Sequence, residues 1–423
     1  MRQPKLLTTL RTYDARQFSA DLIAGITVAL VALPLSIAIA IASGAEPAQG
    51  LVTAVVAGFV ISALGGSRVQ IGGPTGAFVV VVFGVIAEHG YDGLVIATLM
   101  AGGLLLVAGY LRAGRLIAYV PEAVIHGFTI GIAVIIAASQ IKDLFGLSGP
   151  PVPAEFLEKL PALWAVRDTV DPASLGIGLL AMGLIVALRR IAPRFPGLIV
   201  AVAVASLVGA GLGLTVDTIE TRFGALPSGL PAPHLPELSW ARIEELVPSA
   251  IVIAFLAGIE SLLSAMVADR MIDGHHRPNA ELTAQGAANI ASALFGGLPA
   301  TGAIARTATN IRAGGQTPVA GLIHAVTILL ILMVAAPLTG ALAMPALAAL
   351  LMMTAWNMSE PQKWRGYLAG ARSDLFLLLM TLVLTVTVDL TVAIGAGCGV
   401  GLAMKLAQRG PRDAESDWTP RDR

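Results

Sequence analysis

Long apolar runs dominate this chain and limit the solvent in which it can fold. Of its 423 residues, 56% are hydrophobic and only 13% are charged, whereas a soluble globular domain carries about 25% charged residues. So few charges could not cover a water-soluble body of this size, and the chain is predicted to fold in a lipid bilayer. The net charge is zero, which gives no general basic field for nucleic acid. The single cysteine, Cys398, excludes an internal disulfide and a cysteine metal cluster.

Fourteen segments are predicted to cross the membrane, because an unbroken helix needs about 20 apolar residues for this and a broken one needs fewer. The clear apolar runs are 22–42, 49–64, 92–111, 120–141, 173–189, 196–214, 246–268, 281–296, 318–336, 341–356, 374–387 and 390–407. Two further segments, 74–87 and 302–312, are short and interrupted by Gly and Pro. The expected fold is an all-α polytopic membrane protein, in which 142–172 and 215–245 are external connecting loops.

Basic residues are sorted between the two sides that this count defines. One side holds 21 of the 27 basic residues, in both terminal tails and in six loops. The opposite side holds Lys142, Lys159, Arg167, Arg222 and Arg242. Positive residues mark the cytoplasm, so both termini are predicted to be cytoplasmic and the protein to lie in the inner (plasma) membrane. Arg306 fits neither side and is left at membrane depth.

A short motif occurs twice along the chain. Residues 62–66 read SALGG and residues 292–297 read SALFGG, followed by Pro74–Ala77 and Ala300–Ala303 respectively. If the chain divides into seven plus seven spans, each motif falls at the third span of its half. An odd number of spans per half makes the halves antiparallel, which is the pattern of an inverted repeat with discontinuous helices.

These broken spans predict a binding site. Gly and Pro turn each span into an extended stretch followed by a half-helix, whose free N–H groups and partial positive charge attract anions. Irregular backbone at that depth survives only where it lines a protein or water cavity. The predicted substrate-binding residues are Thr75, Gly76, Ala77, Phe78, Thr301, Gly302, Ala303, Ile304, Ala305 and Arg306. The alternative is that both motifs are small-residue packing faces between membrane helices.

Two charged residues lie inside predicted spans. Glu260 is about 14 residues, or roughly 20 Å, into its helix, and a carboxylate at that depth indicates a functional site because it is costly there. Ser264 lies four residues later on the same face, and the pair is predicted to carry a coupling proton. Arg306, just inside the second half-helix, would add a full positive charge. The alternatives are a neutral structural carboxyl for Glu260, and a snorkelling residue or a partner of Glu260 for Arg306.

Other polar residues support weaker hypotheses. Glu122, His126 and Gln140 are expected to be satisfied residues at interfaces, and Glu281 and Asp389 to be residues at span ends. His275 and His276 lie near Asp273 in a cytoplasmic loop, but no further ligand is nearby for a metal. No cofactor is expected, and no constellation of a nucleophile and a base indicates an enzyme.

Several of these stretches resemble the SulP anion transporters, which include sulfate permeases, cyanobacterial bicarbonate transporters, pendrin and prestin. The matching stretches are Asp21–Gly25 with Ala32–Pro34, Gly73–Gly76, His126–Gly131 and Asn279–Asn289, followed by Arg306–Thr307 and Asn310. The resemblance runs in the right order from about residue 18 to 408. The chain therefore resembles the membrane domain of this family, without the cytoplasmic STAS domain that usually follows.

The resemblance implies an arrangement of domains. It implies a core domain from 21–112 and 246–337 and a gate domain from 113–245 and 338–408, with cytoplasmic tails at 1–20 and 409–423. The substrate would lie between the third and tenth spans, the core would slide against the gate as an elevator, and a homodimer is common. Sodium-coupled bicarbonate members look different at three positions. They have an aspartate where this chain has Glu260, and threonines where it has Ser264 and Ile304. Ile304 offers a cation only its backbone carbonyl, so the departures favour proton coupling.

The leading hypothesis is a proton-coupled symporter of a dicarboxylate such as fumarate. The alternative is sodium-coupled or exchange transport of bicarbonate or sulfate. A channel or a non-transporting sensor on the same scaffold is a third hypothesis. A nucleobase transporter is a fourth, although Arg306 argues against an uncharged base.

Overall fold

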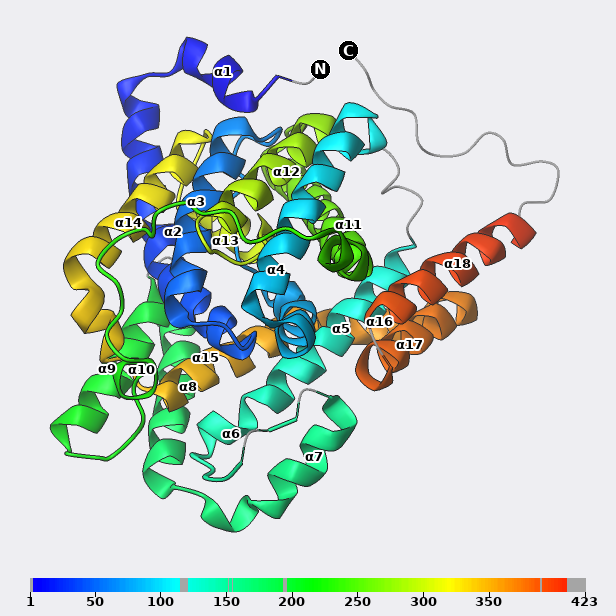
Figure 1. The fold of residues 1–423 in the computed structure, drawn as a ribbon. Coiled ribbons are helices and arrows are strands. Elements are labelled where there is room, and N and C mark those ends of the chain that lie inside the picture. Colours follow the sequence, from blue (N-terminus) through cyan, green and yellow to red (C-terminus); the bar gives the residue numbers. More distant parts are fainter. Residues whose placement is uncertain are drawn as a thin grey trace.

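The computed structural model describes residues 3–114, 121–150, 152–153, 155–192, 196–388 and 390–408, and this part of the chain is almost entirely helical (Figure 1). Two strands of two residues each form its only named sheet. The predicted C-terminal tail, 409–423, and Asp389 lie outside the described residues.

The first half of the chain begins with two long helices, then a strand, then a helix that is interrupted. Its elements are α1 (Lys5–Thr9), α2 (Ala15–Ala42), α3 (Pro47–Leu64), β1 (Gly72–Gly73), the 3-10 turn η2 (Gly76–Phe78), α4 (Val79–Tyr110), α5 (Glu122–Ser139), α6 (Ile141–Leu144), α7 (Phe156–Ala165), α8 (Pro172–Ile191), α9 (Gly197–Gly211) and α10 (Ile219–Phe223). Gly90 breaks α4 with a φ of 71°, which separates the predicted spans 74–87 and 92–111.

The second half repeats this order of two helices, a strand and a helix. Its elements are α11 (Trp240–Ile272), α12 (Pro278–Leu294), β2 (Thr301–Gly302), α13 (Ile304–Arg312), α14 (Val319–Gly340), α15 (Met344–Met358), α16 (Trp364–Ala369), α17 (Arg372–Thr387) and α18 (Leu390–Gln408). The order matches the predicted internal repeat.

Every predicted span coincides with a helix, but length and composition identify fewer crossings. In the described residues, seven helices are long and apolar enough to cross a membrane alone, so the count of fourteen stays a prediction. The predicted connecting segments 142–172 and 215–245 include the short helices α6, α7 and α10. These helices are short and partly polar, so hydropathy did not reveal them.

The helices pack as two groups. In the first helical group, α4 lies against α11 and α12, while α14 lies against α2 and α3. In the second helical group, α5 packs on α17, α15 packs on α8, and α17 packs on α18 (Figure 1). Large apolar side chains such as Val334, 81% exposed, and Ile191, also 81% exposed, cover the outside of the helices. Such a surface suits lipid rather than water.

Two glycines bring α4 and α12 into backbone contact. A methyl group added at Gly102 would lie 2.8 Å from the carbonyl oxygen of Gly286, and one added at Gly286 would lie 2.7 Å from the carbonyl oxygen of Gly102. Small residues permit this close approach between membrane helices. The contact fixes the first half of the chain to the second.

We expect Gly286→Leu to destabilise the folded protein by about 1–3 kcal/mol or more, because backbone atoms cannot move aside as a side chain can. The measurement is the thermal unfolding temperature in detergent. Gly103→Leu is the matched control, since a methyl group there meets nothing within 4 Å. Equal unfolding temperatures for the two variants would contradict this contact.

Candidate functional site

The two strands pair side by side within the first helical group, where β1 contacts α3 and β2 contacts α11. β1 and β2 pair antiparallel, with Gly72 opposite Gly302 and Gly73 opposite Thr301. The N–H of Ala303 donates to the carbonyl of Ile71 at 2.8 Å and extends the ladder by one bond. The two broken spans therefore meet, as the inverted repeat predicted. Each strand satisfies peptide groups of the other that lipid could not satisfy.

Glycine is required on both sides of this ladder. Gly73 has a φ of 148°, which side chains rarely tolerate, and the guanidinium of Arg306 occupies the place where its side chain would begin. The side-chain amide of Gln70 occupies the same place beside Gly302. The motif glycines thus make room for polar side chains.

The first half-site, residues 75–78, is covered. Ala77 and Phe78 are both 2% exposed, and the α4 helix starts directly after them. Above Gly76 lie Ile136 of α5 and Met358 of α15, at 3.2 Å and 3.0 Å from where its side chain would begin. Side chains from the second helical group therefore close this half-site.

The second half-site is open. Ile304 is 42% exposed and Ala305 is exposed as well, at the first turn of α13. The N–H groups of Ile304, Ala305 and Arg306 precede the first intrahelical bond, which Thr307 makes to Ala303 at 2.9 Å. Thr301, in contrast, is fully buried and donates its hydroxyl to Ala257 of α11 at 2.9 Å. Its hydroxyl points away from the open side.

Arg306 links the second half-site to the first. Its side chain is 1% exposed, and its Nη2 donates to the carbonyl of Pro74 at 2.9 Å and to the hydroxyl of Ser36 at 3.1 Å. Its Nε and Nη1 have no hydrogen-bond partner in the described part of the chain. The alternative that Arg306 pairs with Glu260 is not observed, since no ion pair of Arg306 occurs among the described residues. A buried positive charge with free donors lies beside the paired strands.

Glu260 of α11 approaches the first half-site rather than Arg306. Its Oε2 accepts a hydrogen bond from the Thr75 hydroxyl at 3.1 Å, and its side chain is partly buried. Ser264 is fully buried and shares a hydrogen bond with Thr307 at 3.3 Å. The structure thus joins Glu260 to Thr75 and directs Ser264 to α13.

Glu281 lies close to the candidate site but is not among the residues predicted from the sequence. Glu281 was expected at a span end, but its side chain is fully buried and accepts hydrogen bonds from four donors. Its place three residues after the helix start gave no signal of burial. Its partners Gly66 and Ser67 lie 215 and 214 residues away in the chain, so no local pattern in the sequence could have revealed its burial.

His126 is an interface residue, as expected. Its Nδ1 lies 3.2 Å from Glu360, which also contacts Lys363 at 2.7 Å and the hydroxyl of Tyr367 at 3.0 Å. The hydrogen bond from His126 is the main reason that the pKa of Glu360 is lowered to about 2. This cluster lies two residues beyond Met358 and fastens the end of α15.

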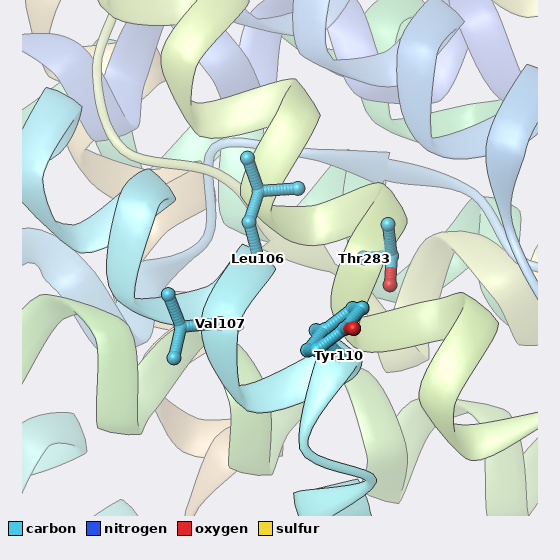
Figure 2. A pocket seen from close by; sticks show the side chains of 4 residues that line it. All are labelled: Leu106, Val107, Tyr110 and Thr283. Atoms are coloured by element: carbon cyan, nitrogen blue, oxygen red, sulfur yellow. The ribbon is translucent and has the colours of Figure 1, made fainter.

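A pocket of about 430 Å³ lies between α4 and α12, and Figure 2 shows the side chains that line it. Leu106, Val107, Tyr110 and Thr283 line it. It contains no predicted site residue and no charged side chain. The pocket is therefore unrelated to the pairing of β1 and β2.

The sequence has known relatives. Residues 18–381 match the model of the sulfate permease family. The chain belongs to the sulfate permease family. The putative sulfate transporter YvdB of Bacillus subtilis is 42% identical over 367 residues, which cover 86% of this chain and 69% of that protein. The bicarbonate transporter BicA of Picosynechococcus is 32% identical over 347 residues, which cover 79% of this chain and 60% of that protein.

Solved structures of the family share the fold. The transmembrane domain of a cyanobacterial bicarbonate transporter BicA matches with a TM-score of 0.81 and 30% identity, over 94% of this chain and 100% of that one. The murine anion transporter Slc26a9 matches with a TM-score of 0.86 over 96% of this chain and 71% of that one, at 17% identity, which shows the fold alone. The predicted all-α polytopic membrane fold and the SulP resemblance are confirmed. The relatives are transporters rather than enzymes.

The unequal cover of the two half-sites can be tested by thiol labelling. In a background with Cys398→Ala, we expect a cysteine at position 305 (Ala305→Cys) to react with a water-soluble methanethiosulfonate reagent. A cysteine at position 77 (Ala77→Cys) should be protected, because Ala77 is 2% exposed. Labelling is read by mass spectrometry of folded protein. Equal reaction at both positions would contradict the burial of Ala77.

Proposed function

We propose that this member of the sulfate permease family is a secondary transporter that carries a small inorganic anion, sulfate or bicarbonate, together with a proton. The observation that carries the proposal is Arg306, a buried guanidinium with free donors beside the paired strands β1 and β2. Free N–H groups at helix starts and an unpaired cation together form an anion site.

The relatives bear on the choice of anion. YvdB is described as a putative sulfate transporter and BicA as a bicarbonate transporter. They favour the alternative of sulfate or bicarbonate over our leading expectation of a dicarboxylate such as fumarate. Either oxyanion offers several acceptor oxygens to the free N–H groups of Ile304 and Ala305 and to the free donors of Arg306.

Glu260 is the proposed carrier of the proton. Its carboxylate touches Thr75, whose backbone belongs to the first half-site. When Glu260 is ionised, its negative charge opposes a nearby anion, and protonation removes that opposition. Proton and anion then each favour the binding of the other, which is the reciprocity that symport needs. Sodium is less favoured, because Ile304 offers a cation no side-chain oxygen.

Movement of the proposed core, 21–112 and 246–337, against the proposed gate, 113–245 and 338–408, would expose the anion alternately. The cover of Gly76 by Ile136 and Met358 supports this idea, because those side chains belong to the proposed gate. Such sliding is an elevator mechanism. Both termini are proposed to be cytoplasmic, in accord with the basic residues.

The test is uptake into proteoliposomes of labelled sulfate, bicarbonate and fumarate under imposed proton or sodium gradients. We expect sulfate or bicarbonate to accumulate when the proton gradient is inward. Arg306→Ala should weaken anion binding by about 10- to 100-fold, since it removes charge-assisted donors. Arg312→Ala, on the exposed end of the same helix, should leave affinity unchanged. Transport of fumarate alone, or unchanged affinity in a monodisperse Arg306→Ala variant, would contradict the proposal.

Glu260→Gln mimics the protonated side chain permanently. We expect this variant to bind the anion normally, yet to lose accumulation driven by a pH difference. Glu244→Gln, at an exposed position of the same helix α11, should behave as the wild-type protein. The measurement is uptake with and without an imposed pH difference. Undiminished pH-driven accumulation by the Glu260→Gln variant would assign the proton to another group.

A further inference from the structure

Glu281 of α12 is fully buried and forms no ion pair within the part of the chain that the structure describes. Its Oε2 accepts from the backbone N–H of Gly66 at 2.8 Å and of Ser67 at 3.3 Å. Its Oε1 accepts from the hydroxyl of Ser261 at 2.8 Å and from the amide of Gln285 at 3.0 Å. All four neighbours donate, so the two carboxylate oxygens act only as acceptors.

The hydroxyl of Ser261 donates its hydrogen bond to Glu281. The Ser261 oxygen already accepts from the amides of Gln70 at 2.8 Å and Gln285 at 2.7 Å, which uses both acceptor positions of a hydroxyl. The hydroxyl must therefore donate to Glu281. Glu281 thus accepts hydrogen bonds at both oxygens, and a side-chain amide in its place would turn donors toward these donors.

The same hydrogen-bond network connects Glu281 to both strands of the proposed anion site. Gly66 and Ser67 lead directly into β1, and the amide of Gln70 packs against Gly302 of β2. Ser261 follows Glu260 in the chain, and Glu260 bonds Thr75. Glu281 thus fixes the approach to one strand by its own hydrogen bonds and reaches the other strand through Ser261 and Gln70.

The far end of α12 holds the second strand in a similar way. Asn289 accepts from the N–H of Ala300 and donates to its carbonyl, both at 2.9 Å, immediately before β2. Ser292 donates to the carbonyl of Leu298 at 2.7 Å. Eight residues separate Glu281 from Asn289, which is about 12 Å of helix. One rigid helix therefore spaces the two incoming segments.

We propose that Glu281 is a positioning residue for the anion site: its buried carboxyl group, with Asn289, holds β1 and β2 in register from α12. The proposal rests on the proposed function, because its test needs an anion that the wild-type protein binds. It assigns Glu281 no contact with the anion and no transfer of protons. In this respect Glu281 differs from Glu260, the proposed proton carrier.

The two carboxylates predict opposite results for the same substitution. In Glu281→Gln an amide NH₂ would face donors, so the segment into β1 should shift and the KM for the transported anion should rise by about tenfold or more. In Glu260→Gln the affinity should persist and only pH-driven accumulation should fail. The probe is whichever of sulfate or bicarbonate the wild-type protein takes up.

Three variants separate positioning from folding. Glu281→Asp keeps a carboxyl group that can accept hydrogen bonds and should restore part of the lost affinity. Ser261→Ala removes one donor and should raise the KM even if Glu281→Gln does not fold. Thr283→Val, on the same helix but outside the network, should leave KM and unfolding temperature nearly unchanged.

The outcomes are distinct. A raised KM in folded Glu281→Gln or Ser261→Ala protein, partly recovered in Glu281→Asp, supports positioning. Normal KM with a lower unfolding temperature in both variants would overturn it in favour of a purely structural role. Normal KM with lost pH-driven accumulation in Glu281→Gln would overturn it in favour of a proton carrier. Wild-type protein that takes up neither anion would instead refute the proposed function.

Discussion

The antiparallel pairing of Gly72–Gly73 with Thr301–Gly302 is the constraint on which the rest of the structure depends. Peptide groups outside a helix are costly at membrane depth unless protein satisfies them. Here each broken span supplies the partner of the other, so both can exist only together. The ladder also sets where the two half-helices begin, and therefore where their free N–H groups point.

Charge inside the first helical group is arranged around this ladder. Arg306 reaches from α13 to the carbonyl of Pro74, beside β1, while Glu281 holds the segment that leads into the same strand. Both are buried, yet they do not form an ion pair with each other among the described contacts. The hydrogen-bond partners of both side chains are uncharged groups, and the Nε and Nη1 of Arg306 keep no partner among the described residues. Glu260 is only partly buried and so suits a group that exchanges protons.

Much of this arrangement was visible in the sequence, and the parts that were not have physical reasons. Apolar runs marked the long helices, and the repeated Ser-Ala-Leu motif marked the two broken spans, because hydropathy and glycine are local signals. Glu260 and Arg306 were predicted as functional residues because they are charged and lie deep inside predicted membrane spans. Burial of Glu281 depends on Gly66 and Ser261, which lie far away in the chain, and no local pattern reports such partners. The link between Ser264 and Thr307 was missed for the same reason, as were the short helices within 142–172 and 215–245.

The contact between Arg306 and Pro74 joins residues 232 positions apart, and this separation has a consequence for biosynthesis. When the ribosome has delivered the first half of the chain to the membrane, β1 has no partner and Gly73 has no guanidinium beside it. The nascent segment must wait, shielded by water, by a translocation factor or by temporary contacts, until β2 and α13 emerge. The first half can therefore complete its fold only after the second half has been synthesised. Until then, the incompletely folded protein is exposed to the degradation machinery of the cell.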